Sequence, residues 1–112
     1  MTFDAHDVII VPFPFTDRAT TKRRPALILS NAAFNVATGH VIAAMITSAK
    51  QSAWDSDLAI TDLAAAGLAV PCVVRMKLFT LEAGLVVRKA GRLGSADAAA
   101  VRTVATQVLA ES

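Results

Sequence analysis

Short apolar runs separated by polar, turn-forming stretches recur along this chain. The clearest is Val8-Ile9-Ile10-Val11, a β-branched run typical of a buried strand, and Pro12 ends it because proline cannot donate to a sheet ladder. The same pattern predicts five more strands, the third ending at Thr47 and Ser48. The expected strands cover residues 8–11, 26–29, 40–46, 58–60, 70–75, interrupted at Pro71, and 85–93, with a bend or bulge at Gly91.

The last segment has a different period. Val101, Val104, Ala105, Val108 and Leu109 recur at the i, i+3, i+4, i+7 spacing of one helix face. We expect Ser95 to cap this helix, and Asp97 to lie in its first turn, where a negative charge is favourable. The chain is therefore expected to be mainly β, as a small barrel with one C-terminal helix, because a barrel leaves few exposed sheet edges.

Two polar loops interrupt the strands, at residues 13–23 and 50–56. The first is long for so small a domain, and long loops in compact domains are often functional. Residues 30–39 have room for one helical turn, and residues 62–67 predict a turn or short helix ended by Gly67.

Length and composition predict one domain over residues 1–112. Hydrophobic residues make up 54% of the chain, yet no apolar run approaches the ~18 residues of a membrane span. The N-terminus does not resemble a signal peptide, and the single cysteine, Cys72, cannot form an internal disulfide. These features predict a cytoplasmic protein without a membrane partner.

The charge is unevenly distributed although the net charge is only +2. One basic cluster occupies residues 18–24 and a second occupies residues 75–92, with Asp55, Asp57 and Asp62 between them. Two interpretations stay open. The clusters form a surface for a polyanion, or they are ordinary solvated side chains.

Metal and nucleophilic chemistry have little support in the sequence. His6 and His40 belong to no ligand-spaced cluster, and Cys72 lies in an expected buried strand without a partnered base. No glycine-rich phosphate loop is present. We therefore expect neither a metal site nor a cofactor.

Arg24 and Thr47 are the candidate catalytic pair. Pro25 biases Arg24 toward an extended conformation just before the second strand, and Thr47 ends the third. If these strands pair as a hairpin-like unit, the two side chains become neighbours. A fixed cation beside a hydroxyl is suited to holding a phosphodiester and stabilising its transition state. The simpler interpretation is an exposed arginine and a threonine favoured by β propensity.

The motifs also resemble a known family. The stretch VPFPFTD at residues 11–17, followed by KRRPALILS at residues 22–30, is similar to the MazF/PemK toxin ribonucleases, and the likeness continues through AMITS at 44–48, VPCVVR at 70–75 and KLFTL at 77–81. The resemblance implies an SH3-like β-barrel with a C-terminal helix, acting as a homodimer. It implies metal-independent, sequence-selective cleavage of single-stranded RNA, leaving 2′,3′-cyclic phosphate and 5′-hydroxyl ends, and a cognate antitoxin that neutralises the toxin.

The resemblance places the family's catalytic arginine at Arg24 and its catalytic threonine at Thr47. Arginine stays protonated in proteins, so we expect Arg24 to stabilise charge or donate a proton rather than act as a base, and Thr47 to donate a hydrogen bond. Met76 is a departure, because many family members have an acidic residue there. Trp54 stacks on a base or anchors its loop. The expected RNA-binding residues are Arg18, Lys22, Arg23, Ser48, Trp54, Arg75 and Lys77.

Two other functions fit the same fold. One is a CcdB-like poison of DNA gyrase, which binds a protein and cuts nothing; intact Arg24 and Thr47 argue against it. The other is a catalytically degenerate toxin kept as an RNA- or partner-binding module.

Overall fold

The fold is built on one curled sheet, whose strands are rich in β-branched and small residues. A computed structural model describes residues 2–13, 22–51 and 53–109. Arg18 lies outside these residues. The elements in order are β1 (Asp7–Pro12), β2 (Arg23–Ile28), α1 (Ala32–Thr38), β3 (His40–Ser48), the 3-10 turn η1 (Ala49–Gln51), β4 (Leu58–Ala59), α2 (Leu63–Ala66), β5 (Cys72–Glu82), the 3-10 turn η2 (Ala83–Leu85), β6 (Arg88–Arg92) and α3 (Ser95–Leu109).

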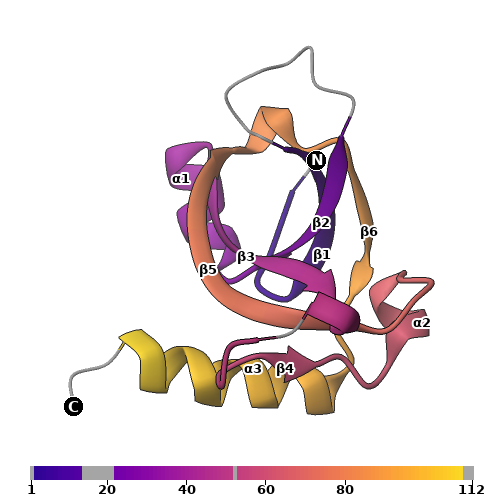
Figure 1. Cartoon of the computed structure of the whole chain (residues 1–112). Helices are drawn as coiled ribbons and strands as arrows, with labels where there is room; N and C mark the ends of the chain where they lie inside the picture. Colours follow the sequence, from indigo (N-terminus) through magenta and orange to yellow (C-terminus); the bar gives the residue numbers. More distant parts are fainter. Residues whose placement is uncertain (1, 14–21, 52, 110–112) are drawn as a thin grey trace.

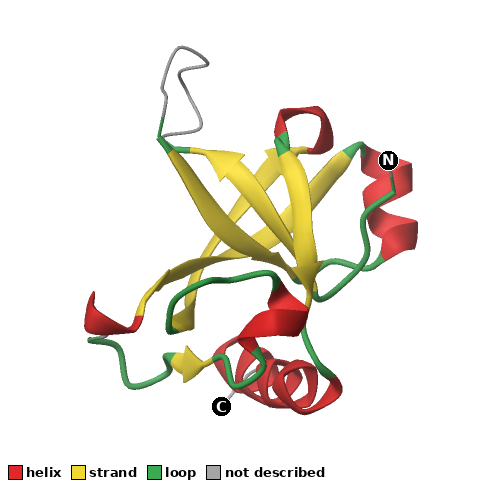
Figure 2. Ribbon diagram, turned by 90° about the vertical axis from the view of Figure 1, so that its right-hand side faces the viewer, coloured by secondary structure: helices red, strands yellow, loops and turns green. Residues whose placement is uncertain are grey.

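The six strands form one antiparallel sheet in the order β4-β5-β3-β2-β1-β6. The sheet curls so strongly that β5 sweeps around the side opposite β1 and β6 (Figure 1), and a quarter-turn shows the same strands as a half-barrel (Figure 2). α3 lies below the curl, beside β4 (Figure 1). The expected mainly-β barrel with a C-terminal helix is confirmed.

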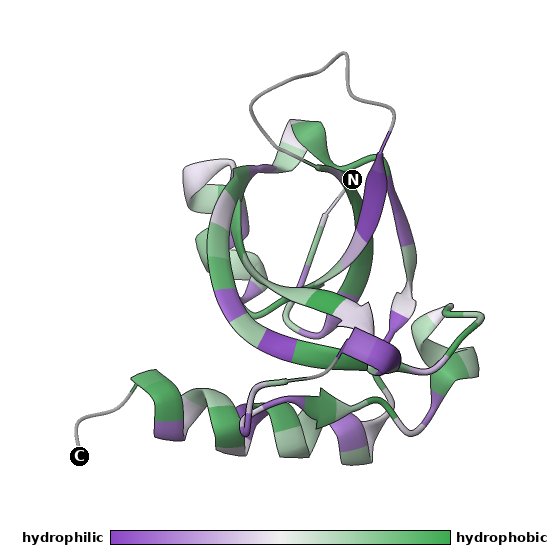
Figure 3. Ribbon diagram, viewed as in Figure 1, coloured by the Kyte–Doolittle hydropathy of each residue, from purple (hydrophilic) through white to green (hydrophobic). Residues whose placement is uncertain are grey.

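Both faces of the sheet are buried at β1, which explains the continuous apolar run in this strand. Val8 belongs to a cluster that includes Ala98 and Val101 of α3, whereas the next residue, Ile9, belongs to a second cluster with Phe3. Successive strand residues point to opposite faces, so a strand buried on both sides needs apolar residues at every position. Hydrophobic colour accordingly dominates the curl, while the start of β2 and η1 are hydrophilic (Figure 3).

Several strand boundaries differ from the sequence predictions. β5 runs from Cys72 to Glu82 rather than 70–75, because it pairs with β3 along that strand's whole length. A bulge in β5 breaks its alternation and hides the strand in the sequence. β2 begins at Arg23, so Arg24 lies within the strand rather than before it. The predicted strand 85–93 is shorter, because η2 occupies residues 83–85.

Side-chain caps and close contacts fix the short helices. Asn31 accepts a hydrogen bond from the Phe34 amide to start α1, which is longer than the one turn expected. Gly67 ends α2 with a φ of 72°, as predicted. The bulge predicted at Gly91 is also confirmed, since Val8 pairs with Gly91 and Ile9 with Lys89. A side chain at Gly91 would collide with the carbonyl oxygen of Ala65.

Asp97 does more than favour the dipole of α3. Ser95 is the first helical residue rather than the residue before the helix, and Asp97 is in the first turn as expected. Its buried carboxylate accepts hydrogen bonds from the Thr61 amide, the Thr61 hydroxyl and the Asp62 amide, at 2.7 to 3.1 Å. Burial by itself would raise the pKa of Asp97, but these hydrogen bonds lower it below its usual value. The carboxylate thus ties α3 to the segment after β4.

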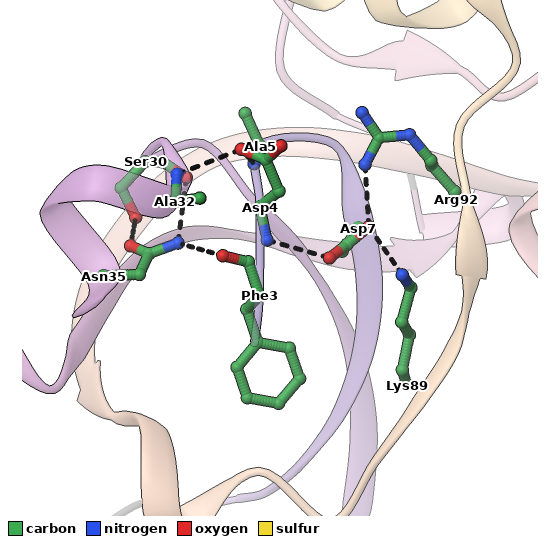
Figure 4. Close-up of polar contacts among 9 residues, drawn as sticks. All are labelled: Phe3, Asp4, Ala5, Asp7, Ser30, Ala32, Asn35, Lys89 and Arg92. Carbon is green, nitrogen blue, oxygen red and sulfur yellow. Dashed lines mark hydrogen bonds and ion pairs between the residues drawn. The ribbon is translucent and has the colours of Figure 1, made fainter. Parts of the chain in front are cut away.

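A second buried carboxylate fixes the N-terminal segment (Figure 4). Asp7, whose side chain is 1% exposed, lies 2.9 Å from an Arg92 nitrogen and 3.1 Å from the Lys89 ammonium, and it accepts from the Asp4 amide. Asn35 donates from its amide to the Phe3 carbonyl oxygen, which holds the segment from the α1 side.

No described helix is long and apolar enough to cross a membrane.

Candidate active site

Strand pairing brings Arg24 and Thr47 together. β2 and β3 are antiparallel, with Ala26 opposite Met45, and continuing this register by two residues places Arg24 opposite Thr47. Both residues line one open pocket of ≈ 220 Å³, so the proximity predicted from the sequence is confirmed. The pocket is lined by Phe13, Arg24, Met45, Ile46, Thr47, Gln51, Arg75 and Lys77.

The bulge in β5 adds two basic residues to the same pocket. Ala44 pairs with Leu78 and the next residue, Met45, pairs with Arg75, which leaves Met76 and Lys77 out of register. Met76 is buried in the core next to α3, whereas Lys77 is exposed and lines the pocket with Arg75. The residue in which this chain departs from the family pattern therefore has a packing role here.

Arg24 has a positive charge that no carboxylate of the described residues neutralises. The ion pairs of the described residues use Arg75, Lys89 and Arg92, and none uses Arg24. Its guanidinium lies 5.8 Å from the centroid of the Phe13 ring, a distance at which the ring face attracts a cation. An exposed cation oriented by an aromatic ring can bind an anion without first breaking an ion pair.

Thr47 supplies a hydroxyl on the pocket wall. The residue is half-buried, and within the described part of the chain its hydroxyl makes no hydrogen bond. A hydroxyl is both donor and acceptor, so it can donate to an oxygen bound beside Arg24. Together the two side chains present a fixed cation and a hydrogen-bond donor to one ligand.

Arg75 is held in place by its neighbours. Its Nε and Nη2 donate to the two carboxylate oxygens of Asp57 at 3.1 and 2.8 Å, and Nη2 also donates to the Gln51 carbonyl oxygen at 3.1 Å. The hydrogen bond with Asp57 raises the pKa of Arg75 further. Arg75 thus forms a rigid wall of the pocket, with much of its charge already compensated by Asp57.

The other predicted RNA-binding residues that the structure describes do not line this pocket. Lys22 and Arg23 are exposed at the start of β2. Ser48 lines a separate pocket of ≈ 280 Å³ with Lys50 and Pro71. Trp54 does not line the Arg24 pocket, but its ring contacts Arg75.

The sequence did not reveal Phe13, Gln51 and Asp57 as parts of the site. Phe13 follows β1 and Gln51 ends η1, and the curl of the sheet brings both to the pocket of Arg24. Asp57 was visible only as one of several acids between two basic clusters. An acid 18 positions before an arginine carries no local signal, because the pair forms across β4 and β5.

The two histidines and Cys72, the candidates for metal or nucleophilic chemistry, do not line the Arg24 pocket. Among the described residues, no three histidine, cysteine, aspartate or glutamate side chains gather in a group suited to a metal ion. Cys72 is buried in the core, and this burial raises the pKa of its thiol. Burial, together with nearby Arg102 and Arg92, lowers the pKa of His6, away from the Arg24 pocket.

Comparison with known families decides what kind of protein carries this site. Residues 4–109 match the model of the PemK-like, MazF-like toxins of type II toxin–antitoxin systems. The chain belongs to this toxin family. Because the match spans nearly the whole chain, the pocket at Arg24 and Thr47 lies inside the toxin domain.

Solved structures share the toxin fold. A MazE–MazF complex from Deinococcus radiodurans matches with a TM-score of 0.78 and 24% identity over 100% of both chains. MazF alone from that organism matches with a TM-score of 0.76 and 23% identity over 99% of both chains. A mycobacterial endoribonuclease bound to its cognate antitoxin gives a TM-score of 0.74 and 18% identity over 96% of this chain and 93% of that one. At these identities the likeness establishes the fold. No curated protein matches the chain significantly.

Proposed function

We propose that this toxin is an endoribonuclease that cuts single-stranded RNA at short sequence motifs. One observation carries the proposal: Arg24, without a carboxylate partner among the described residues, shares a pocket with the Thr47 hydroxyl. A phosphodiester is the anion that such a pair suits, because the cation balances its charge and the hydroxyl donates to one of its oxygens. Family membership supports the proposal, and one similar structure is itself an endoribonuclease.

The proposed reaction is an internal transesterification. The 2′-hydroxyl oxygen of the RNA forms a new bond to phosphorus as it loses its proton, and the bond from phosphorus to the 5′-oxygen breaks as that oxygen gains a proton. The products are a 2′,3′-cyclic phosphate and a 5′-hydroxyl. The step consumes no water and leaves the number of protons unchanged.

Arg24 and Thr47 act on the phosphate in this proposal. Arginine remains protonated, so Arg24 stabilises the extra negative charge of the pentacoordinate transition state or protonates the leaving 5′-oxygen. Thr47 donates a hydrogen bond to a phosphate oxygen. Neither residue is the nucleophile, because the substrate supplies its own. The proposal therefore includes activity without a metal ion.

Two protein partners belong to the proposal. Two of the similar structures are MazE–MazF or endoribonuclease–antitoxin complexes, and we infer a cognate antitoxin for this chain too. Carboxylates of an acidic antitoxin segment would occupy the pocket that otherwise holds phosphate, so RNA and antitoxin should compete. We also infer a homodimer in the cytoplasm, with an interface of about 2,000 Å² or more.

Incubation of the purified protein with single-stranded RNA in excess EDTA tests this function. The proposal expects cleavage, whereas a gyrase poison would leave RNA intact and inhibit supercoiling by DNA gyrase. A degenerate toxin would bind RNA without cutting it. Cleavage that depends on added magnesium would contradict the metal-independent mechanism.

A further inference from the structure

The segment 53–57 is folded tightly around one carboxylate. The Asp57 side chain is only 3% exposed, and its Oδ2 accepts hydrogen bonds from the Ala53 amide at 3.2 Å and the Trp54 amide at 3.3 Å. The Asp57 amide in turn donates to the Trp54 carbonyl oxygen at 2.9 Å. These bonds close a turn that fixes the backbone at Trp54.

The same carboxylate reaches across to β5. Both oxygens of Asp57 accept from Arg75, in the two-bond geometry that fixes a guanidinium plane. That guanidinium lies 5.0 Å from the centroid of the Trp54 ring. One buried aspartate therefore fixes both the guanidinium of Arg75 and the backbone at Trp54, and the guanidinium lies over the indole ring.

The stacked pair is placed at the edge of the Arg24 pocket. Arg75 lines the pocket, and Gln51, whose carbonyl oxygen Arg75 also binds, lines it as well. Trp54 nevertheless remains 45% exposed. A tryptophan that only anchored a loop would gain by burying its ring, whereas this ring is held rigid with much of its surface open to solvent.

We propose that Trp54, backed by Arg75, is a stacking shelf for one unpaired nucleobase next to the scissile phosphate, and that Asp57 is its positioning residue. This inference rests on the proposed function. Bases stack on aromatic rings through a face that every base has, so the shelf binds any base and is insensitive to its hydrogen-bonding edge. A rigid shelf costs little conformational entropy on binding.

Loss of the shelf should weaken binding rather than chemistry. Stacking on one aromatic ring corresponds to about 5- to 150-fold in affinity. The interaction is the same in the bound substrate and in the transition state, so Trp54→Ala should raise KM by that factor and leave kcat nearly unchanged. Trp54→Phe should recover part of the loss. Val36→Ala, which trims another exposed apolar side chain on α1, is the matched control and should have no effect.

Abasic substrates identify the base that stacks. Once the cut site is mapped, oligonucleotides lacking one base at a time on either side of it are cleaved by wild type and by Trp54→Ala. The proposal expects one position at which the missing base raises the wild-type KM but not the KM of the variant. Asp57→Asn should weaken the sensitivity at this same position, without changing the sensitivity elsewhere.

Tryptophan fluorescence tests the shelf independently of cleavage. Trp54 is the only tryptophan in the chain, so its emission reports on this site alone. An RNA oligonucleotide with one deoxynucleotide at the cut site should quench it, and the abasic version should quench it much less. Equal quenching by both, or equal abasic sensitivity in wild type and Trp54→Ala, would overturn the shelf. A wild-type protein that is quenched by RNA but never cuts it would instead overturn the proposed nuclease function.

Discussion

Two basic clusters that look alike in the sequence differ in what neutralises them. In the first cluster, residues 18–24, Arg24 faces the pocket with no carboxylate beside it in the described structure. In the second, residues 75–92, Arg75 is bound to Asp57, while Lys89 and Arg92 both contact Asp7. Lys77, which also lines the pocket, forms no ion pair with any residue that the structure describes.

Charge that is clustered in the sequence is therefore not the same as charge that is available to a ligand. A cation already paired with a buried carboxylate contributes little to the field outside the protein, and using it on a ligand requires breaking the pair. Asp7 and Arg92 are 85 positions apart, so no local pattern reveals their pairing. Arg24 is the residue we propose for catalysis because no described carboxylate pairs with it, whereas Arg75 and Arg92 hold buried carboxylates in place.

The largest expected effect comes from removing Arg24. Arg24→Ala should lower the RNA cleavage rate at least ~100-fold, the scale of losing one preorganised transition-state contact. Arg88→Ala is the matched control, because Arg88 is also an exposed strand arginine without an ion pair in the described structure. Both variants should keep the wild-type circular dichroism spectrum. A folded Arg24→Ala protein with full activity would show that the unpaired charge is not the catalytic one.

Thr47 should matter as much as Arg24 or somewhat less. Thr47→Ala removes the hydroxyl beside the phosphate and should lower kcat by about 10- to 100-fold. Thr47→Ser retains the hydroxyl and should recover most of the rate, as single-turnover kinetics would show. Equal losses in the alanine and serine variants would indicate that packing of the Thr47 methyl group, rather than its hydroxyl, is what the site requires.

The paired cluster should respond in stability instead of rate. Asp7→Asn removes the buried charge that Lys89 and Arg92 share and should lower the free energy of unfolding by about 1–3 kcal/mol. The cost stays below that of a fully buried pair because the two cations are half-exposed and can hydrate. Urea denaturation measures the change, with Asp55→Asn at an exposed position as control. A large loss of cleavage rate in folded Asp7→Asn protein would contradict the claim that the paired cluster contributes to stability rather than to catalysis.

The smallest expected effect is a difference between Lys77 and Lys89 in their contribution to the salt dependence of RNA binding. Three to five phosphate contacts predict a slope of log Kd against log salt concentration of roughly 2 to 3.5 in magnitude. Lys77→Ala should reduce that magnitude by about 0.7, the contribution of one single-strand contact. Lys89→Ala should change it little because Asp7 already binds this ammonium. Equal changes in the two variants would mean that pairing does not withdraw charge from the RNA.

Much of the fold was accessible from the sequence because its signals are local. The β-branched run of β1, the helical spacing in α3 and the glycines at positions 67 and 91 each act through nearby residues. The length of β5 was not accessible, since its bulge at Met76 and Lys77 disrupts the alternation that identifies a strand. Features set by residues close in the sequence could thus be predicted, whereas features set by distant residues could not.

The contacts in the candidate site also differ in whether the sequence could predict them. Arg24 and Thr47 could be placed together because antiparallel neighbours along the chain pair in a predictable register. The Asp57–Arg75–Trp54 contacts could not, because they join segments whose spatial relation depends on the whole curl of the sheet. Arg75 was accordingly expected to bind RNA directly, and that role stays a prediction for a side chain that Asp57 already holds.

In the proposed mechanism, the protein supplies charge and a hydrogen bond while the RNA supplies the nucleophile. The most direct test compares two oligonucleotides in excess EDTA, one all-ribose and one with a single deoxynucleotide on the 5′ side of the cut. This mechanism requires that both bind equally, that only the all-ribose strand is cut, and that its fragments end in a 2′,3′-cyclic phosphate and a 5′-hydroxyl. Cleavage of the deoxy-substituted strand at the same bond, or fragments ending in a 5′-phosphate, would contradict it.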